Sequence, residues 1–377
     1  MSETIHDGDR LVPSELERQQ IFHLMQKVSS ITAWRRILLL YKAWADVTKA
    51  SWHEALKQGW EEQTSLPSSE LNFILEGFVA FKKGLLKLEE KNFKRFAALP
   101  LEDFIEAHRR LHLQLSTLNR VDDGENGIDE AHTPRWQEYC EAMNAVFDAW
   151  QECSMHISAH PHFNGGLWYY NRWLIRDLQL MHFPPVLPAV PDPAIDILVR
   201  AEDFVPYAGI WEPVAAPASS WRDHFTDSWR PRPPFTVVGA MKYFSARSRA
   251  PGIMLAQDTD SNNADVKLDM AWRLLWIEDR YTDGTIPEQE AQYQFLEPER
   301  SHPKSSPADG AGEVWAWSGA AAPASGRWRD EADGSYTHLR KQGQRMGFSY
   351  GRPVRWILQE PRRIVPRVTP TVSPDNS

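Results

Sequence analysis

The sequence predicts an α+β protein: an N-terminal antiparallel helical bundle followed by a mainly antiparallel β domain with a loose internal duplication. Three observations predict this arrangement. Apolar residues recur at helical spacing up to about Pro184, a proline-rich stretch follows, and short strand-like runs punctuated by Trp and Gly come after it. At 377 residues the chain is too long for one compact core and suits two domains.

The first helices have clear start and stop signals. Ser14 and Glu17 form a capping box, in which each side chain accepts a hydrogen bond from the other residue's backbone amide, so a helix is expected from this point. The helix is expected to break near Ser29–Ser30, to restart, and to run to about Trp60.

Proline marks the later helix starts. Helices are expected after Pro67, after Pro100 and at Thr133–Pro134, where a capping residue precedes a proline at the first helical position. A last, aromatic-rich segment covers residues 167–181. Five or six helices joined by short loops indicate an antiparallel bundle.

Proline also marks the expected domain boundary. Residues 183–193 contain five prolines, which remove backbone donors and prevent a regular helix or strand. The tail should be disordered because it is a chain terminus. The predicted organisation is a helical bundle domain at residues 1–183, a linker at 184–194, a Trp- and Gly-rich β domain at 195–365 and a tail at 366–377.

Two similar segments in the β domain predict the duplication. The run APASSWRD at 216–223 is similar to APASGRWRD at 322–330, and each copy later reaches a strand-like run, around Trp272 and Trp356. Short strands with Trp and Gly at similar offsets favour a twisted antiparallel sheet or a small barrel in each copy. The expected repeats cover residues 205–297 and 312–362.

The charge balance argues against nucleic acid as a partner. The formal net charge of −9 divides into −6 over residues 1–185, with 20 Lys and Arg against 26 Asp and Glu, and −3 over the rest, with 22 against 25. Neither half offers the clustered Lys and Arg that nucleic-acid binding needs. The longest apolar stretch, Ile37 to Tyr41, is too short to span a bilayer, and the N-terminus carries no apolar signal segment. The sequence therefore predicts a cytoplasmic protein without a membrane partner.

The two cysteines, Cys140 and Cys153, lie 13 residues apart on one expected helix. That spacing separates them by about 20 Å along the helix, too far for a disulfide. Free, buried thiols are expected, and they suit a reducing compartment.

Two clusters have some resemblance to metal sites. Cys153, His156, His160 and His162 have ligand-like spacing, but Pro161 should end the helix, so a polar helix end is the favoured interpretation and no metal is expected. The acidic loop from Asp122 to Glu130 has the charge of a calcium loop without its register. A solvated loop is favoured there, with docking of a basic partner as the alternative.

No catalytic residue is predicted. The phosphate-binding, dinucleotide-binding, nucleophile-elbow and zinc-protease motifs are absent from the sequence. A scattered carboxylate pair stays open as a route to glycoside chemistry. The chain is therefore expected to bind a partner rather than to catalyse a reaction, and no cofactor is expected.

Three segments of the β domain carry a family resemblance: YAGIWEPV at Tyr207–Val214, the run at Gly239–Phe244, and AWRLLWIEDRYTDGTIPEQEAQY at Ala271–Tyr293. They resemble the immunity proteins of bacterial polymorphic-toxin and type VI secretion systems, in the families numbered 71 and 72. A C-terminal pattern is also similar, at Ser325, Gly326, Trp328, Arg340, Gly343, Met346, Val354 and Trp356. Relatives often have a Cys-Pro pair where this chain has Ala322-Pro323, so no thiol acts there.

The resemblance implies a non-catalytic protein that binds and neutralises a cognate toxin encoded beside it. Such an interface rests on a few buried aromatic or Arg anchors within a polar rim. The candidate toxin-binding residues lie in the segments that carry the resemblance. They are Glu278, Asp279, Arg280 and Asp283 of one charged turn, together with Trp211 and Glu212.

Other interpretations stay open. The 17 tryptophans also suit a carbohydrate- or peptide-binding module in which surface rings stack on a ligand. An enzyme of unrecognised type is a third possibility, and a homodimer is left open. The charged turn at Glu278–Asp283 also suits an ordinary solvated edge.

Overall fold

In the described part of the computed structural model, five helices precede a five-stranded and a four-stranded sheet, both mainly antiparallel, so the α+β prediction is confirmed. None of the described helices is long and apolar enough to cross a membrane. The structure describes residues 12–90, 101–122, 127–154, 156–158, 174, 178, 181–217, 229–255, 266–296, 305, 313–331, 334, 337–349 and 354–361.

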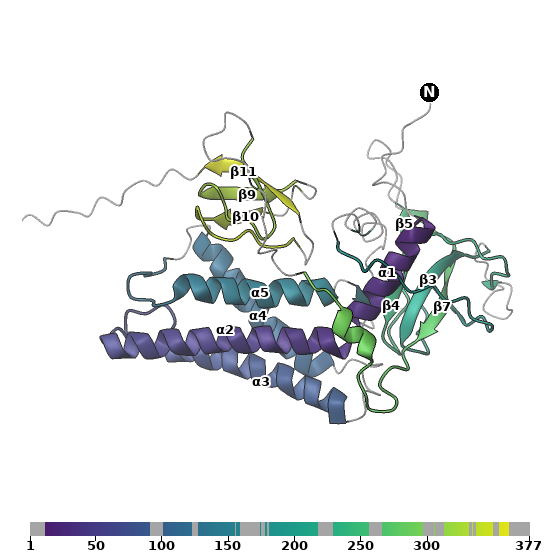
Figure 1. Cartoon of the computed structure of the whole chain (residues 1–377), viewed down its shortest axis with the longest axis horizontal. Coiled ribbons are helices and arrows are strands. Elements are labelled where there is room, and N and C mark those ends of the chain that lie inside the picture. Colours follow the sequence, from purple (N-terminus) through teal and green to yellow (C-terminus); the bar gives the residue numbers. More distant parts are fainter. Residues whose placement is uncertain are drawn as a thin grey trace, which may run out of the picture.

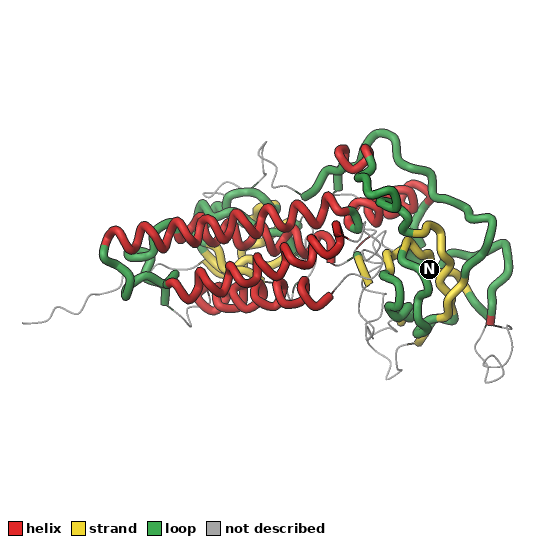
Figure 2. Tube along the Cα trace, turned by 90° about the horizontal axis from the view of Figure 1, so that it is seen from below, coloured by secondary structure: helices red, strands yellow, loops and turns green. Residues whose placement is uncertain are grey.

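The helices form an elongated bundle, with the first sheet at one end and the second sheet on its side (Figures 1 and 2). The capping box at Ser14 and the break at Ser29–Ser30 are both present, as predicted. The break turns the first helix out of the bundle and toward the first sheet (Figure 1). The helices are α1 (Glu15–Val28), α2 (Ile31–Gln58), α3 (Ser68–Glu90), α4 (Leu101–Asp122) and α5 (Trp136–Ser154).

Helix α5 begins slightly later than the predicted start at Thr133–Pro134. Arg135 has a left-handed backbone with a φ of 58°, which no helix continues. The Thr133 hydroxyl accepts a hydrogen bond from the amide of Ser65 instead of capping its own helix. Of the aromatic-rich segment at 167–181, only Leu174, Leu178 and Met181 belong to the described residues.

Two glycines of α3 let this helix pack closely with α2 and α4. A Cβ atom at Gly77 would lie 2.1 Å from the Tyr41 hydroxyl, and one at Gly84 would lie 3.1 Å from the Phe104 ring. A side chain at either position would therefore force a neighbour to move.

The first sheet contains five strands in the order β1-β4-β3-β7-β2. Four of them pair antiparallel, and β1, which follows α5, joins the β4 edge in parallel. The strands are β1 (Ile157–Ser158), β2 (Leu198–Arg200), β3 (Gly209–Ala215), β4 (Lys242–Phe244) and β7 (Met270–Ile277). The segment Glu288–Gln292, which follows Pro287, forms a short 3-10 helix, η6.

The second sheet contains four antiparallel strands in the order β10-β9-β11-β8. They are β8 (Trp315–Trp317), β9 (Gly326–Asp330), β10 (Thr337–Arg340) and β11 (Arg355–Pro361). A separate two-stranded ribbon consists of β5 (Met254–Leu255) and β6 (Val266–Lys267).

The four antiparallel strands of the two sheets have the same topology. In both, the third strand in chain order lies next to the second, the second next to the fourth, and the fourth next to the first. The second strand begins with Gly209 in one sheet and Gly326 in the other. Two residues later each strand carries a fully buried tryptophan, Trp211 or Trp328. The sheets are therefore two copies of one structural unit.

The registers agree residue by residue. The tryptophan of the fourth strand, Trp272 or Trp356, pairs in each copy with the residue two positions after the buried tryptophan of the second strand. Each register then skips one residue on the fourth strand. The indole N–H of Trp272 donates to the carbonyl of Pro251 at 2.8 Å, and that of Trp356 donates to Gly347 at 2.9 Å.

These registers confirm the match of Trp272 with Trp356 but correct the alignment of 216–223 with 322–330. The Gly343 amide donates to the Ala322 carbonyl, as the Arg247 amide donates to the Val205 carbonyl in the first copy. Ala322 therefore corresponds to Val205, and not to Ala216. The runs at 216–223 and 322–330 are similar in sequence but do not occupy equivalent positions in the two sheets. The equivalent positions are marked by the glycine and the buried tryptophan of the second strand.

One hydrophobic core runs from the helices into the first sheet, and the second sheet has a smaller core of its own. The proline-rich residues 184–194 contain neither helix nor strand, as predicted. The first core nevertheless continues on both sides of this stretch, because α1 packs against β3. The division between cores falls after the first sheet, while the predicted boundary at 184–194 stays a prediction. The predicted disordered tail, 366–377, lies outside the described residues.

Candidate functional site

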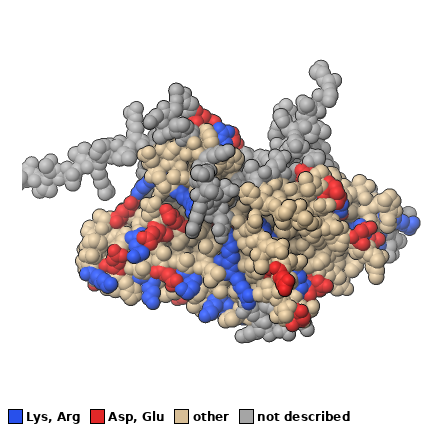
Figure 3. Space-filling model, viewed as in Figure 1, with Lys and Arg blue, Asp and Glu red and all other residues tan. Residues whose placement is uncertain are grey.

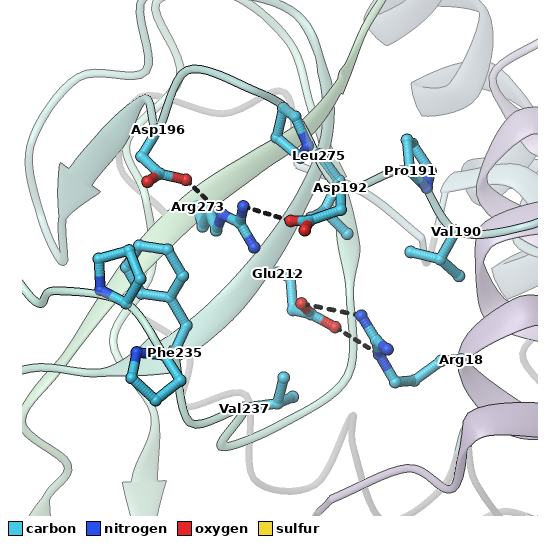
Figure 4. Close-up of a pocket in the computed structure, with 13 residues that line it drawn as sticks. Arg18, Val190, Pro191, Asp192, Asp196, Glu212, Phe235, Val237, Arg273 and Leu275 are labelled. Carbon is cyan, nitrogen blue, oxygen red and sulfur yellow. Dashed lines mark hydrogen bonds and ion pairs between the residues drawn. The ribbon is translucent and has the colours of Figure 1, made fainter.

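A cleft of about 550 Å³ lies where α1, the proline-rich segment and the first sheet meet (Figure 4). Arg18 enters it from α1, Glu212 from β3 and Arg273 from β7, while Asp192 and Asp196 come from the segment that leads into β2. The cleft is therefore lined by charged side chains from three parts of the chain.

Arg18 and Glu212 form a two-pronged ion pair across this cleft. The Nε atom of Arg18 donates to Glu212 Oε1 at 2.8 Å, and its Nη2 atom donates to Oε2 at 3.2 Å. Burial raises the pKa of the Glu212 carboxyl, while the hydrogen bond and the charge of Arg18 act against this rise. Glu212 is only 2% exposed, so the arginine supplies the partner that water cannot.

Arg273 fixes the proline-rich segment to the sheet. Its Nε atom donates to Asp196 at 2.9 Å, its Nη2 atom donates to Asp192 at 2.6 Å, and its guanidinium lies 4.5 Å from the ring centre of Phe235. An arginine within the apolar run AWRLLWI was a sequence signal for this contact, because a charge there needs a partner.

The charges of this cleft are satisfied by each other. Among the described residues, no group of three or more His, Cys, Asp or Glu side chains is arranged to hold a metal ion. The geometry serves to hold α1, the proline-rich segment and the sheet together.

A second junction lies at the start of α2, where the segment after β7 caps the helix. The amide of Ile31 donates to the Tyr281 hydroxyl at 2.9 Å. The amide and the hydroxyl of Thr32 both donate to Glu290 Oε2, at 3.2 and 2.6 Å, and Tyr281 donates to the other carboxylate oxygen. A carboxylate at a helix N-terminus also interacts favourably with the helix dipole.

Arg280 holds the same segment to the end of α1. Its guanidinium pairs with Glu278 at 2.5 Å and donates to the Gln26 carbonyl at 2.7 Å and to the Ser29 hydroxyl at 2.7 Å. Burial lowers the pKa of Arg280, but the neighbouring Glu278 outweighs this and keeps the guanidinium charged. Its side chain is 5% exposed.

Glu152 is the hub of a third buried network. Its carboxylate accepts hydrogen bonds from Lys27 at 2.9 Å, from Arg36 at 3.1 Å and from the Leu296 amide at 3.2 Å. It therefore ties α1, α2 and α5 to the segment that follows η6. No motif marked Glu152, because its partners are 116 or more residues away in sequence.

The predicted toxin-binding residues occupy two environments. Trp211 and Glu212 are buried on β3, and Glu278 and Arg280 pair with each other inside the protein. These four side chains therefore make contacts within the protein itself. Asp279 and Asp283 are exposed, and Asp283 accepts hydrogen bonds from the amide and hydroxyl of Thr285 within its turn.

The other predicted clusters fall partly outside the described residues. Cys140 and Cys153 are free and buried on α5, as expected. Burial raises the pKa of the Cys153 thiol to about 12, and His156 is also buried, whereas His160 and His162 lie outside the described part. In the acidic loop, which is only partly described, Glu130 pairs with Lys341 of the second sheet's loop.

The described tryptophans serve mainly to pack the protein. Seven of them are buried: Trp34, Trp44, Trp150, Trp211, Trp272, Trp328 and Trp356. The remaining described tryptophans are half-buried, and none of those described is fully exposed. Half of the fourteen described tryptophans are therefore buried in cores.

Comparison with protein families matches two separate regions of the chain. Residues 12–165 match the family model described as immunity protein 71, and residues 191–294 match that of immunity protein 72. The chain is therefore similar to two immunity-protein families, each over a separate region. Searches of curated proteins and of solved structures returned no match to it.

The immunity protein 71 region contains α1 to α5 and β1, and the immunity protein 72 region contains β2 to β7 and η6. The charged cleft and the contacts at the start of α2 therefore both join one region to the other. The second sheet lies beyond both matches, yet it repeats the topology of the sheet in the immunity protein 72 region.

Proposed function

We propose that this chain is an immunity protein that binds a cognate antibacterial toxin in the cytosol and neutralises it without catalysis. The observation that carries the proposal is the pair of family matches, which together cover the helices and the first sheet. The Arg18–Glu212 ion pair, the contact of Glu290 with Thr32 and that of Arg280 with the Gln26 carbonyl join the two regions, which supports a single binding unit.

Neutralisation would follow from occupation of the toxin's active surface through a large complementary interface. Such interfaces form between well-ordered surfaces that lose little conformational freedom on binding. The three buried networks provide that order here, since they fix α1 and the segment after β7 at the junction of bundle and sheet. On the face seen in Figure 3, Lys and Arg alternate with Asp and Glu over the helices, which suits a protein partner better than nucleic acid.

Asp279 and Asp283 are the predicted contacts best placed for the toxin. Both are exposed, next to the buried Glu278–Arg280 pair that fixes the position of their turn. Rigid placement of an exposed carboxylate strengthens an ion pair with a partner, because less side-chain and loop entropy is lost.

Co-expression tests the proposed function. The open reading frame next to this gene is expressed in bacteria with and without this protein, and growth is measured. We expect the neighbouring product to arrest growth alone and the full chain to restore it. A neighbouring product without toxicity, or toxicity that the chain does not relieve, would refute the proposal. Delivery by a contact-dependent or a type VI secretion system is a further proposal, tested by deletion of the secretion apparatus in the toxin-producing cell.

Charge reversal separates the surface role of the turn from its structural role. We expect Asp279→Lys to weaken toxin binding by more than about 1 kcal/mol, the value of a rigid ion pair, without lowering the melting temperature. Glu278→Lys should lower the melting temperature, because it places a second cation beside buried Arg280. Wild-type affinity in Asp279→Lys would exclude this residue from the interface.

A further inference from the structure

The two sides of the second sheet differ in composition. Along β9, Gly326, Trp328 and Asp330 are buried on the inner side, while Arg327 and Arg329 are partly exposed on the other side. The registers place Trp315, Trp317, Arg355, Ile357, Thr337 and Leu339 on the same side as these two arginines. We call this side the outer face of the second sheet.

The outer face has the composition of a binding surface. It carries three arginines and two tryptophans, Trp315 and Trp317, all partly exposed. The Arg355 guanidinium lies 4.9 Å from the ring centre of Trp315. Arginine and tryptophan are the residues most enriched among those that carry binding energy at protein interfaces. Arg355 is also paired with Glu331 at 2.8 Å, and the register places Glu360 opposite Arg327.

The first sheet shows what such a face binds in this fold. Its equivalent face carries Ile210, Glu212 and Val214, which are 0%, 2% and 0% exposed. They are buried because α1 packs against β3 and sends Arg18 to Glu212. Figure 1 shows α1 beside β3 and β4. The face therefore accepts an amphipathic helix, fixed by one ion pair.

The second copy reverses the charge of that ion pair. Gly326 corresponds to Gly209, so Arg329 occupies the position of Glu212 and Arg327 that of Ile210. The Nε atom of Arg329 is buried and has no hydrogen-bond partner among the described residues. A helix on this face must therefore bring a carboxylate where α1 brings a guanidinium.

No described helix of the chain occupies the outer face. Among the described elements, α4 packs against this sheet at β10, and Asp148 of α5 interacts with Arg340 of the same strand. In β10 the inner-side residues His338 and Arg340 are the buried ones, whereas Thr337 and Leu339 of the outer face stay partly exposed.

We infer that the outer face of the second sheet binds an acidic amphipathic helix of the toxin, with a carboxylate paired to Arg329. This inference rests on the proposed function and names the surface that would carry it. A second copy of this chain is disfavoured as the occupant, because its α1 would bring Arg18 against Arg329. Single-stranded nucleic acid also stacks on aromatic residues between cations, but the acidic chain and the helix on the equivalent face favour protein.

Binding of the purified product of the neighbouring gene to the full chain tests this inference by calorimetry. We expect Arg329→Glu to raise Kd at least tenfold, about 1.4 kcal/mol, with an unchanged melting temperature. Arg329→Gln, which keeps the size of the side chain without its charge, should raise Kd less. Arg247→Glu is the matched control: it makes the same charge change on an exposed loop of the first sheet and should alter Kd less than twofold.

The outcomes separate this inference from the proposed function. If wild-type protein does not bind the neighbouring product, the proposed function itself fails. If wild-type protein binds and both Arg329 variants bind equally well, the toxin uses another surface and the inference fails. It also fails if Arg329→Glu changes self-association in sedimentation, or abolishes binding of a fluorescent oligothymidine, since the face would then serve a second copy or nucleic acid.

Discussion

At the start of α2, the Glu290 carboxylate accepts a backbone hydrogen bond that no carbonyl group of the helix can accept. A helix leaves its first amides without intrahelical acceptors, and here Glu290, Tyr281 and Ser30 satisfy those of Thr32, Ile31 and Ala33. Two of these three caps come from residues about 250 positions later in the chain. At this scale, a single carboxylate joins local helix formation to the tertiary fold.

Glu290→Ala should destabilise the protein by on the order of 2 kcal/mol or more, because it leaves the Thr32 amide and the Tyr281 hydroxyl without their buried acceptor. Urea unfolding followed by circular dichroism measures this loss. Glu288→Ala, on the exposed side of the same 3-10 helix, is the control and should change stability by less than about 0.5 kcal/mol. Equal effects of both changes would contradict the capping role.

Gly209→Ala should be among the most damaging single-methyl changes in the chain. Gly209 has a φ of 155°, and a Cβ atom there would lie 2.0 Å from the Trp276 carbonyl oxygen of the neighbouring strand. The backbone of β7 must move or β3 must leave its register, at a cost of roughly 3 kcal/mol or more. Gly127→Ala, with no atom within 4 Å, provides the comparison. If the Gly209→Ala protein were as stable as the Gly127→Ala protein, β3 and β7 could move apart to accept the methyl group without loss of stability.

Asp148 gives the fold a dependence on pH. Burial raises the pKa of this α5 carboxyl from 3.8 to about 7, although Arg340 and Arg36 act to lower it, and Glu152 adds to the rise. The folded protein therefore binds more protons than the unfolded chain between about pH 4 and pH 7. Stability supplied by the protonated carboxyl is complete below pH 4 and is lost as the pH rises through 7.

Asp148→Asn removes this dependence. The free energy of unfolding of the wild type should fall relative to that of the variant as pH rises from 4 to 7, by on the order of 1–4 kcal/mol. Urea titrations at several pH values measure the difference. Parallel pH profiles for the two proteins would mean that Asp148 titrates normally in the folded state.

At the scale of elements, the break at Ser29–Ser30 gives α1 its position on the first sheet. The Ser29 and Ser30 hydroxyls donate to the last carbonyls of α1, at Met25 and Lys27, and Ser30 also caps α2. The chain therefore ends one helix and starts the next within two residues. Helix α1 is then free to leave the bundle and cover β3.

Arg18→Ala tests the hold of α1 on the sheet. Loss of this guanidinium leaves Glu212 buried without its partner and should cost about 2–3 kcal/mol, somewhat less than a fully buried pair because the Arg18 side chain is 24% exposed. Glu15→Ala is the control, since it removes only the exposed contact to the same arginine. Thermal unfolding of the two variants should differ by several degrees. Matching unfolding curves would show that α1 is held by apolar contacts alone.

At the scale of the whole molecule, the protein has two cores of unequal size. The larger one joins all five helices to the first sheet, and the smaller one belongs to the second sheet. Loss of the second sheet therefore removes few contacts from the larger core. Loss of the first sheet and of the segment after β7 removes the partners of Arg18, Ile31 and Thr32.

Truncation after residue 296 should leave a protein that unfolds cooperatively with its helical content retained. Truncation after residue 183 should give a protein with loosened tertiary packing, because the β side of the larger core is missing. Circular dichroism and denaturant unfolding compare the two. A stable, cooperative 1–183 fragment would support independent domains on either side of the proline-rich stretch.

Local signals in the sequence predicted local structure well. The capping box at Ser14, the break at Ser29–Ser30 and the strands around Trp272 and Trp356 depend on neighbours in the chain, and all are present. The shared core was not predicted, because it depends on α1 meeting β3 across almost 200 residues. The spacing of apolar residues in the sequence shows that one face of a helix or strand is apolar, but it does not show which element covers that face.

The candidate site was predicted only in part for the same reason. Glu212, Glu278 and Arg280 appeared as surface charges, since charged residues are usually exposed. Their partners, Arg18 and the carbonyl groups at the end of α1, are remote in sequence and could not be paired with them from one chain. Asp279 and Asp283, which have no such remote partner among the described contacts, are exposed as the usual rule suggests.

The repeated sheet has a consequence for how this protein can evolve. A substitution on the outer side of β3 must remain compatible with α1, so that surface is constrained by the protein's own stability. The corresponding side of β9 carries no described helix, and its strands keep their register through Gly326, Trp328 and Trp356 on or near the inner side. Substitutions can therefore accumulate on this side of one copy while the other copy preserves the scaffold.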